Sequence, residues 1–285
     1  VMSKFEDYLQ HHKTDAVIVV DDLASTMAAA IVAKKQGLIL AHLAAGTRSF
    51  DITMPKEINR LVIDGLSDIL FTAGISNNAV ANRECAELSK VYMVGNILID
   101  NIRNNHARFT RPQILAAQGI KDGEYIVFTL NRKALMAARE NLHRMLEAII
   151  TAAGNTPIIA PLHTKAADTV TQLLPKDATR FLITAPMGYL DFSYLASHAK
   201  GIITDSGNVA EEATFNMVPC ITLNSYTEHI ETVKTGTNVL VGEDAELLAQ
   251  YTADMTAGKW KQHSIPERWD GRSAERILQT LMARQ

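Results

Sequence analysis

The sequence is poor in cysteine, with only Cys85 and Cys220 among its 285 residues. The two lie far apart and form neither a metal-binding motif nor a disulfide framework, which indicates a reducing compartment such as the cytoplasm. No apolar run is long enough to span a bilayer, and the first residues lack the apolar segment of a signal peptide. We therefore expect a cytoplasmic protein with no metal site and no membrane contact.

An excess of charge is also missing. Lysine and arginine number 28 against 31 aspartates and glutamates, which gives a formal net charge of −3. Without a basic surplus there is no electrostatic argument for a nucleic-acid partner. Hydrophobic residues make up 47% of the chain, and this length suffices for one large or two medium globular domains.

Short apolar runs alternate with helical patterns along the whole chain. The runs that predict strands are DAVIVV (15–20), LILAHLAAG (38–46), DILFTA (68–73), VYMVGN (91–96), YIVFTLN (from 125), PIIAPL (157–162), RFLITA (180–185), GIIT (201–204), PCITL (219–223) and TNVLVG (237–242). Apolar strands separated by helices are typical of parallel sheets covered on both faces. Two such series predict two doubly wound α/β domains, 1–104 and 105–262, with a polar hinge over 101–122.

Polar residues follow several of the predicted strands. In open parallel sheets ligands bind beyond the carboxyl ends of the strands, and we expect these residues to line a cleft between the two domains. They are Asp21 and Asp22, His42 to Arg48, Asn131 and Arg132, His163, and Asp205 to Gly207.

The stretch GIITDSGNVAEEA (201–213) predicts a strand, a turn and the start of a helix. Backbone N–H groups at Ser206 and Gly207 could hold an anion there. Glu211 or Glu212, further into the helix, could accept hydrogen bonds from sugar hydroxyls, which suggests a nucleotide-sugar as the ligand. The alternative is an ordinary capped helix with two solvated acids.

Five stretches carry a family resemblance: HLAAGTRSFDITMPKEINRLVIDGLSDILF, VYMVGNILID, GYLDFSYLASHAKGIITDSGNVAEEATFNMVPCITL, TEHIETVKTGTNVLVG and DGRSAERIL. From about residue 13 onward the chain resembles the non-hydrolysing UDP-N-acetylglucosamine 2-epimerases. The resemblance implies a glycosyltransferase-B architecture of two Rossmann-like domains, with a C-terminal helix (263–285) that crosses back to the first. It also implies a cytoplasmic homodimer, without a cofactor, that supplies UDP-N-acetylmannosamine for surface polysaccharides.

The resemblance also implies a mechanism and a set of site residues. The family removes the C2 proton, eliminates UDP, and adds it back while a proton returns to the other face of C2. This chemistry needs acid–base groups on both faces of the sugar and a firm hold on the diphosphate. The UDP-binding positions match Arg132, Phe192, Ser206, Gly207 and Glu212, and the acid–base aspartate matches Asp22.

Several other positions depart from the family pattern. Residues that carry acid–base groups in the family match Ala44, Lys56 and Asn131, and a family arginine matches His229. These losses predict weakened epimerisation. The family's opening strands have no counterpart before residue 13, so we expect an incomplete first sheet and either a homodimer or an obligate partner to cover its apolar edge.

Two hypotheses therefore remain open: a UDP-sugar epimerase that uses Asp22, and a non-catalytic UDP-sugar-binding or regulatory protein. Each single residue also has a structural interpretation. Asp22 could be a helix N-cap, and His42 and His163 could be hydrogen-bonded core residues. Lys56 could be an ordinary surface lysine, and the two cysteines could be buried apolar residues.

Overall fold

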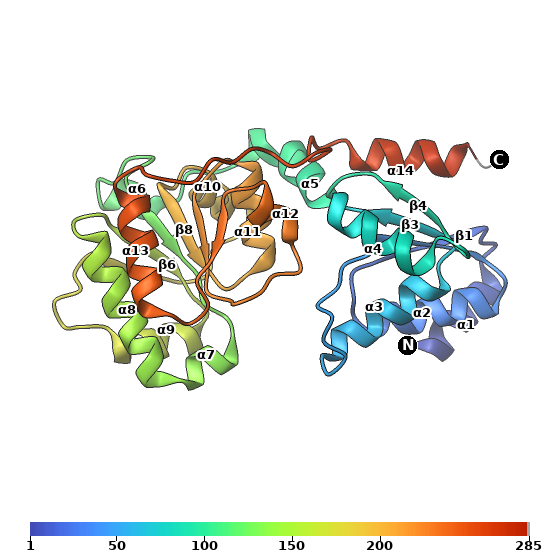
Figure 1. Cartoon of the computed structure of the whole chain (residues 1–285), viewed down its shortest axis with the longest axis horizontal. Coiled ribbons are helices and arrows are strands. Elements are labelled where there is room, and N and C mark those ends of the chain that lie inside the picture. Colours follow the sequence, from blue (N-terminus) through green and yellow to red (C-terminus); the bar gives the residue numbers. More distant parts are fainter. Residues whose placement is uncertain (284–285) are drawn as a thin grey trace. The chain divides into compact units, whose positions relative to one another are not determined.

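The computed structural model describes residues 1–283. The chain forms two compact units (Figure 1). Unit 1 comprises Val1–Arg103 and the segment from Glu267 onward, and unit 2 comprises Asn104–Pro266. Throughout the described residues, every helix is too short or too polar to cross a membrane.

Unit 1 is built on a four-stranded parallel sheet of order β1-β2-β3-β4. The strands are β1 (Ala16–Val20), β2 (Ile39–Ala45), β3 (Ile69–Thr72) and β4 (Lys90–Met93). The helices are α1 (Met2–His11), α2 (Ala24–Lys35), α3 (Pro55–Leu66), α4 (Ile75–Cys85), α5 (Ile97–Asn105) and α14 (Ser273–Met282). Pro55 at the first position of α3 fixes its entry, because proline lacks the N–H that would stay unpaired there.

The core of unit 1 lies on both faces of this sheet. Helices α2 and α3 pack over Leu40 on one face, and α14 places Ile277 against Leu43 and Phe71 on the other. On the α14 face the edge strand β1 stays open, with Ile18 and Val20 46% and 50% exposed. The apolar side chains of Ile18 and Val20 on this edge strand are therefore exposed to solvent.

Unit 2 contains a six-stranded parallel sheet of order β10-β9-β8-β5-β6-β7. The strands are β5 (Ile126–Phe128), β6 (Ile158–Pro161), β7 (Phe181–Thr184), β8 (Gly201–Thr204), β9 (Cys220–Thr222) and β10 (Asn238–Leu240). The helices are η1 (His106–Arg108), α6 (Gln113–Ala117), α7 (Lys133–Ala137), α8 (Arg139–Ala153), α9 (Thr164–Leu173), α10 (Tyr189–Ser197), α11 (Gly207–Phe215), α12 (Ile230–Lys234) and α13 (Ala245–Thr256). The strand order runs outward in both directions from β5 and β8, which makes their carboxyl ends the switch point of the sheet.

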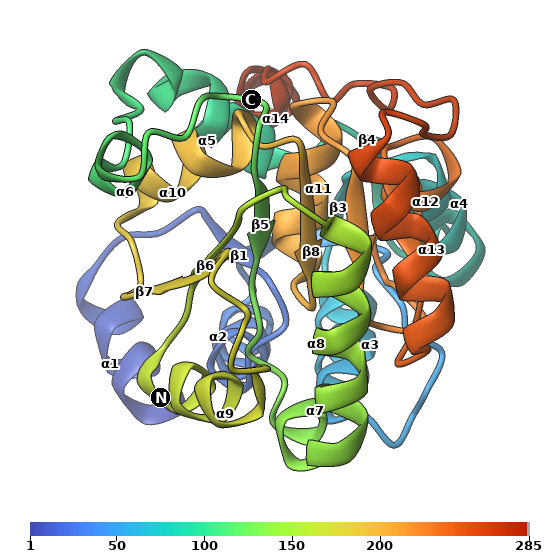
Figure 2. The ribbon, with the colours of Figure 1, turned by 90° about the vertical axis from the view of Figure 1, so that its left-hand side faces the viewer.

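Helices cover both faces of the second sheet. Figure 2 shows α8 and α13 side by side, and with α9 they bury one apolar cluster against β5, β6 and β8. Helices α6, α10 and α11 bury a second cluster on the opposite face. Because the strands are covered on both sides, their sequences are continuously apolar rather than alternating.

The predicted fold class, an α/β chain with two parallel sheets, is confirmed. Two local features bear on the sequence-based expectation. Ala138 separates α7 from α8 within the run 134–153, which has a helical pattern in the sequence. The segment 101–122, where a hinge is predicted, contains the boundary between the units after Arg103, and further along it α6 buries Leu115 in unit 2.

Candidate functional site

The carboxyl ends of β5 and β8 are joined by Asp205. Its Oδ2 accepts hydrogen bonds from the backbone N–H groups of Asn131 and Arg132, at 2.7 and 2.5 Å. One layer below, the hydroxyls of Thr129 and Thr204 are 2.6 Å apart. The Asp205 carboxylate thus holds the loop after β5 against the turn after β8, and it is a positioning residue at the switch point of the sheet.

Helix α11 begins at this turn and has an uncapped start. Ser206 is the N-cap residue, yet its side chain makes no capping hydrogen bond. Within residues 1–283, no acceptor takes the backbone N–H groups of Gly207, Asn208 and Val209. These groups carry the positive end of the helix dipole, so the turn is suited to an anion.

Gly207 is required at this turn by the close approach of another side chain. A Cβ atom at this position would lie 2.4 Å from Cδ2 and Nε2 of His229. That distance is far inside van der Waals contact, so any other residue would displace the imidazole. The glycine therefore lets His229 lie directly against the first residue of α11.

The two glutamates of α11 have different environments. Glu211 accepts a hydrogen bond from Nδ1 of His229, with an N–O distance of 2.8 Å. Glu212 is 8% exposed, and within the described chain its carboxylate makes no hydrogen bond or ion pair. Burial, together with the neighbouring charge of Glu211, raises the pKa of Glu212 to about 7. Of the two, Glu212 is the carboxylate that still lacks hydrogen-bond donors.

Arg132 lies beside the turn at the start of α11, and Phe192 packs against the apolar side of the same unit. Arg132 donates from Nη1 to Oδ1 of Asn224 at 2.8 Å and pairs through Nη2 with Glu243. Its Nε is buried without a partner among the described residues. Phe192 on α10 packs against the same apolar cluster that α11 covers. The five predicted binding residues thus lie on unit 2, on or beside the elements around the switch point.

In unit 1, Asp22 lies at the carboxyl end of β1 and is 5% exposed. Its Oδ2 accepts from Nε and Nη2 of Arg60 at 2.8 and 2.5 Å, and Nζ of Lys56 lies 3.2 Å from Oδ1. Burial alone would raise the pKa of Asp22, but the charges of Arg60 and Lys56 outweigh it and lower the pKa. Helix α2 begins with Leu23 as its N-cap, so Asp22 is not the capping residue.

Lys56 therefore forms an ion pair and is not only a solvated surface lysine. Its side chain is 59% exposed, but the ammonium group contacts the Asp22 carboxylate. Beside it, Glu57 is buried and accepts from the backbone N–H groups of Ser49 and Phe50 at 2.8 and 3.1 Å. Glu57 fixes the loop after β2 and is occupied by that structural role.

A second buried charge cluster surrounds Asp64, which is fully buried. Asp64 lies 2.5 Å from Nδ1 of His42 and 2.8 Å from Nη1 of Arg48, and it accepts from the backbone of Gly46 at 3.0 Å. Burial would raise its pKa, but His42 and Arg48 outweigh this and lower it. His42 is thus a hydrogen-bonded core residue.

Sequence reasoning missed the roles of Arg60 and Asp64. A signal was present, since Lys56, Arg60 and Asp64 stand four residues apart along one helix. This spacing places them on a single face of α3. Charges of both signs along one face of a helix could have pointed to partners on the neighbouring strands.

The backbone at the end of β2 is unusual. Ala44 has φ of 64° at a β-bulge between Leu43 and Ala45. Asp21, directly after β1, and Phe50, in the loop between β2 and α3, have φ of 67° and 59°. Left-handed backbone in non-glycine residues is costly and gathers at functional sites. The bulge thus places position 44 near the carboxyl end of β2, although alanine has no acid–base group.

A pocket of about 20 Å³ adjoins Ala44. Its lining includes Asn96, whose Nδ2 is buried without a partner among the described residues. This volume is about that of one water molecule. The amide marks a hydrogen-bond donor next to position 44.

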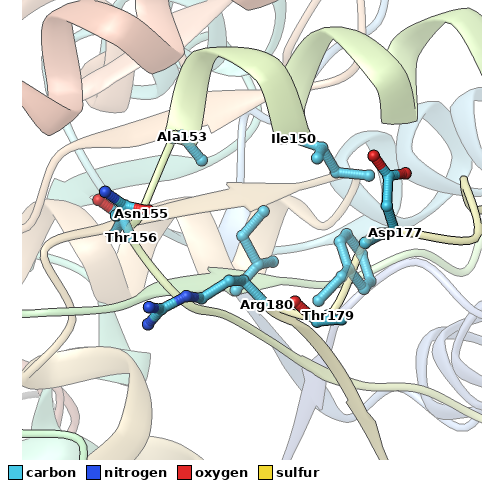
Figure 3. A pocket seen from close by; sticks show the side chains of 11 residues that line it. Ile150, Ala153, Asn155, Thr156, Asp177, Thr179 and Arg180 are labelled. Atoms are coloured by element: carbon cyan, nitrogen blue, oxygen red, sulfur yellow. The ribbon is translucent and has the colours of Figure 1, made fainter.

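The remaining sequence candidates lie elsewhere. His163 is exposed at the N-cap of α9, and His11 and His12 are exposed on and just after α1. Cys85 is partly buried in unit 1 and Cys220 is buried in unit 2. A pocket of about 250 Å³ lies at the end of α8, and its lining includes Asn155 and Arg180, which precede β6 and β7 (Figure 3). It lies at the amino ends of these strands, opposite to the edge that carries Asp205.

Comparison with known proteins agrees with this geometry. Two parallel α/β units, the second with an anion-suited turn at its switch point, define a protein of the glycosyltransferase-B type. The profile of the UDP-N-acetylglucosamine 2-epimerase family matches residues 1–282. The chain belongs to this family.

Individual relatives cover nearly the whole chain. The UDP-N-acetylglucosamine 2-epimerase of Methanocaldococcus jannaschii is 35% identical over 294 residues, which cover 99% of this chain and 79% of the relative. The UDP-2,3-diacetamido-2,3-dideoxy-D-glucuronate 2-epimerase of Pseudomonas aeruginosa is 33% identical, covering 99% and 78%. The crystal structure of the M. jannaschii enzyme with UDP-GlcNAc and UDP superimposes with a TM-score of 0.82 at 34% identity, covering 99% and 79%.

Proposed function

We propose that this chain binds a UDP-sugar through unit 2 and epimerises it at C2 far more slowly than an ordinary enzyme. The uncapped start of α11 supports the binding half of this proposal. There Ser206 and Gly207 would receive the diphosphate. Glu212, which is buried and has no partner among the described residues, would accept hydrogen bonds from the ribose. Arg132 would add a positive charge near the phosphates, and Phe192 would contact the nucleotide.

The lowered pKa of Asp22 supports the second half of the proposal, which is slow epimerisation. A general acid or base works best when its pKa lies near the working pH. Two cations lower the pKa of Asp22, so it stays ionised and is a weak base. Positions 44, 56 and 131 offer no second group for the opposite face of C2. Each positioned acid–base group contributes about 10²–10⁴-fold, and the losses are not additive.

One experiment separates the two halves of the proposal. The protein is incubated with UDP-N-acetylglucosamine in D₂O, and proton NMR follows deuterium at C2 and the appearance of UDP-N-acetylmannosamine. Calorimetry with UDP measures binding in parallel. We expect binding with very slow exchange. Epimerisation at about 1–10³ s⁻¹ would refute the weakened activity and make Asp22 the first candidate for the proton transfer. Absence of UDP binding at millimolar concentration would refute the binding role.

We further propose that the chain acts in the cytoplasm as a homodimer or with an obligate partner. The exposed Ile18 and Val20 on the edge of unit 1 support association, since such apolar edges are normally covered. The two free thiols fit a reducing compartment. Light scattering that shows a stable monomer over the micromolar range would contradict the assembly.

A further inference from the structure

His229 lies at the anion-suited start of α11 in a fixed orientation. Its Nδ1 is hydrogen-bonded to Glu211 at 2.8 Å, and the Cδ2–Nε2 edge of its ring lies against Gly207. His229 is also the N-cap of α12, where its backbone carbonyl accepts from Thr232. Both the backbone and the ring are therefore held, and Nε2 lies close to the first residue of α11.

A second observation at the same place points to a ligand. Glu212 is 92% buried yet makes no hydrogen bond or ion pair within residues 1–283. Helical side chains lean toward the amino end of their helix, which directs Glu212 toward the first turn of α11, where Asn208 lies. A buried carboxylate without donors beside backbone N–H groups without acceptors fits a ligand that carries both an anion and hydroxyl groups.

We propose that protonated His229, oriented by Glu211, supplies the positive charge opposite the diphosphate of a UDP-sugar, so that binding weakens as the pH rises from about 5.5 to 8.5. This inference rests on the proposed binding function. Histidine is the side chain that ordinarily changes its charge in this pH range. A cation adds strength to a phosphate contact because charge-assisted hydrogen bonds are about twice as strong as neutral ones.

The ionisable groups that contact His229 or adjoin it in the sequence are mostly acidic. Glu211 contacts it from α11, and Glu228 and Glu231 stand on either side of it in its own segment. Lys234 ends α12, and Asp205 precedes α11 with its carboxylate held by the amides of the 131–132 loop. The negative groups outnumber the single lysine.

Glu212 also titrates in this range, and the experiment must separate the two residues. The probe is UDP-N-acetylglucosamine, because both of its phosphates are esterified and its own charge stays constant over this range. Calorimetry at pH 5.5 and 8.5 compares the wild type with His229→Arg, His229→Gln and Glu211→Gln. Glu212→Gln is the matched control, because it removes the second titrating group and leaves the imidazole in place.

We expect wild-type affinity to fall roughly tenfold between the two pH values, the size of one charge-assisted contact. His229→Arg should bind at pH 8.5 as tightly as the wild type does at pH 5.5, and His229→Gln should bind weakly at both. Glu212→Gln should keep most of the pH dependence. Glu211→Gln keeps the histidine and should move the fall to lower pH, which provides a test if substitution of His229 disturbs the fold.

The possible outcomes distinguish the inference from the function on which it rests. If the wild type binds the probe but His229→Arg has the same pH profile, or His229→Gln binds normally at pH 5.5, the role of His229 is refuted and the binding function stands. If the wild type binds neither the probe nor UDP at any pH, the binding function itself is wrong.

Discussion

The ammonium group of Lys56 lies 3.2 Å from the carboxylate of Asp22, one turn along α3 from Arg60, which holds the other oxygen. Asp22 thus faces two positive charges from one helix. This arrangement surrounds with positive charge the carboxylate that we propose as the acid–base group of the chain. A position at the end of a strand is therefore not sufficient to make Asp22 an effective acid or base, because the neighbouring charges set its pKa.

Restoring the family groups should raise the rate of C2 proton exchange. Ala44→Glu, Lys56→Glu and Asn131→His together return three acid–base groups, and the new carboxylate at 56 removes one cation beside Asp22 and raises its pKa toward neutrality. We expect at least a tenfold gain in deuterium incorporation at C2, a small part of the 10²–10⁴-fold that each group contributes. Adding Asp22→Asn should abolish the gain, and an equal rate in both multiple variants would contradict the role of Asp22.

Asp64 should dominate the acid sensitivity of unit 1. Its folded pKa is lowered, so its stabilisation is complete above the ordinary aspartate value of about 4 and is lost as the pH falls through the folded value. Asp64→Asn leaves His42 and Arg48 without their buried partner and should cost roughly 3–5 kcal/mol at pH 7. Urea unfolding between pH 3 and 7 tests this. The exposed Asp15→Asn is the control and should leave the profile unchanged.

Glu212 should destabilise the free protein at neutral pH. Its pKa is raised to about 7 in the folded state, so the folded protein is most stable below the ordinary glutamate pKa and loses stability as the pH rises to about 7. The loss is roughly 3 kcal/mol. Glu212→Gln should therefore be more stable than the wild type at pH 8 and equal to it at pH 4. Glu246→Gln on the surface should show no such difference.

The same residue should favour binding. Replacing Glu212 with alanine should weaken UDP binding by roughly 1–3 kcal/mol, because the ribose hydroxyls lose a buried acceptor. Calorimetry should compare the binding of UDP and of inorganic pyrophosphate to the wild type and to Glu212→Ala. Pyrophosphate has no ribose, so it should bind the two proteins alike. If substitution of Glu212 makes the protein more stable and also weakens UDP binding, then Glu212 favours binding at the expense of stability.

Position 44 should prefer glycine for stability. Ala44 has left-handed backbone, where a side chain costs roughly 1–2 kcal/mol and glycine costs little. Ala44→Gly should therefore raise the free energy of unfolding by up to about 1 kcal/mol, after the larger entropy of the unfolded glycine is subtracted. Ala45→Gly, one residue later in the buried strand, should lower it. Equal losses in both variants would contradict strain at Ala44.

Much of the fold could be predicted because the strands are apolar on both faces and the helices between them are bounded by polar turns. The runs at 15–20, 38–46 and 201–204 contain β1, β2 and β8. The break at Ala138 was not predictable, since KALMAARENL has no proline or glycine to interrupt a helical pattern. The strand pattern also gave no sign of the bulge at Ala44, which depends on pairing with β3.

The candidate site could be predicted only where its residues are close in sequence. The turn at Ser206 and Gly207 and the glutamates of α11 lie within seven residues, so their spacing already suggested an anion and a sugar. The partners of Asp22 and His42 come from α3, far along the chain, and the approach of His229 to Gly207 joins two separate segments. Such contacts follow from tertiary packing, which no local pattern encodes.

Each unit carries one thiol, and the two differ in protection. Burial raises the pKa of Cys220 to about 12, and it raises that of the partly buried Cys85 as well. Because only the thiolate reacts readily, an alkylating reagent can modify Cys220 only when unit 2 opens. The rate of modification at Cys220, read by mass spectrometry of peptides, thus reports the opening of unit 2, and the partly exposed Cys85 in the same chain provides an internal reference.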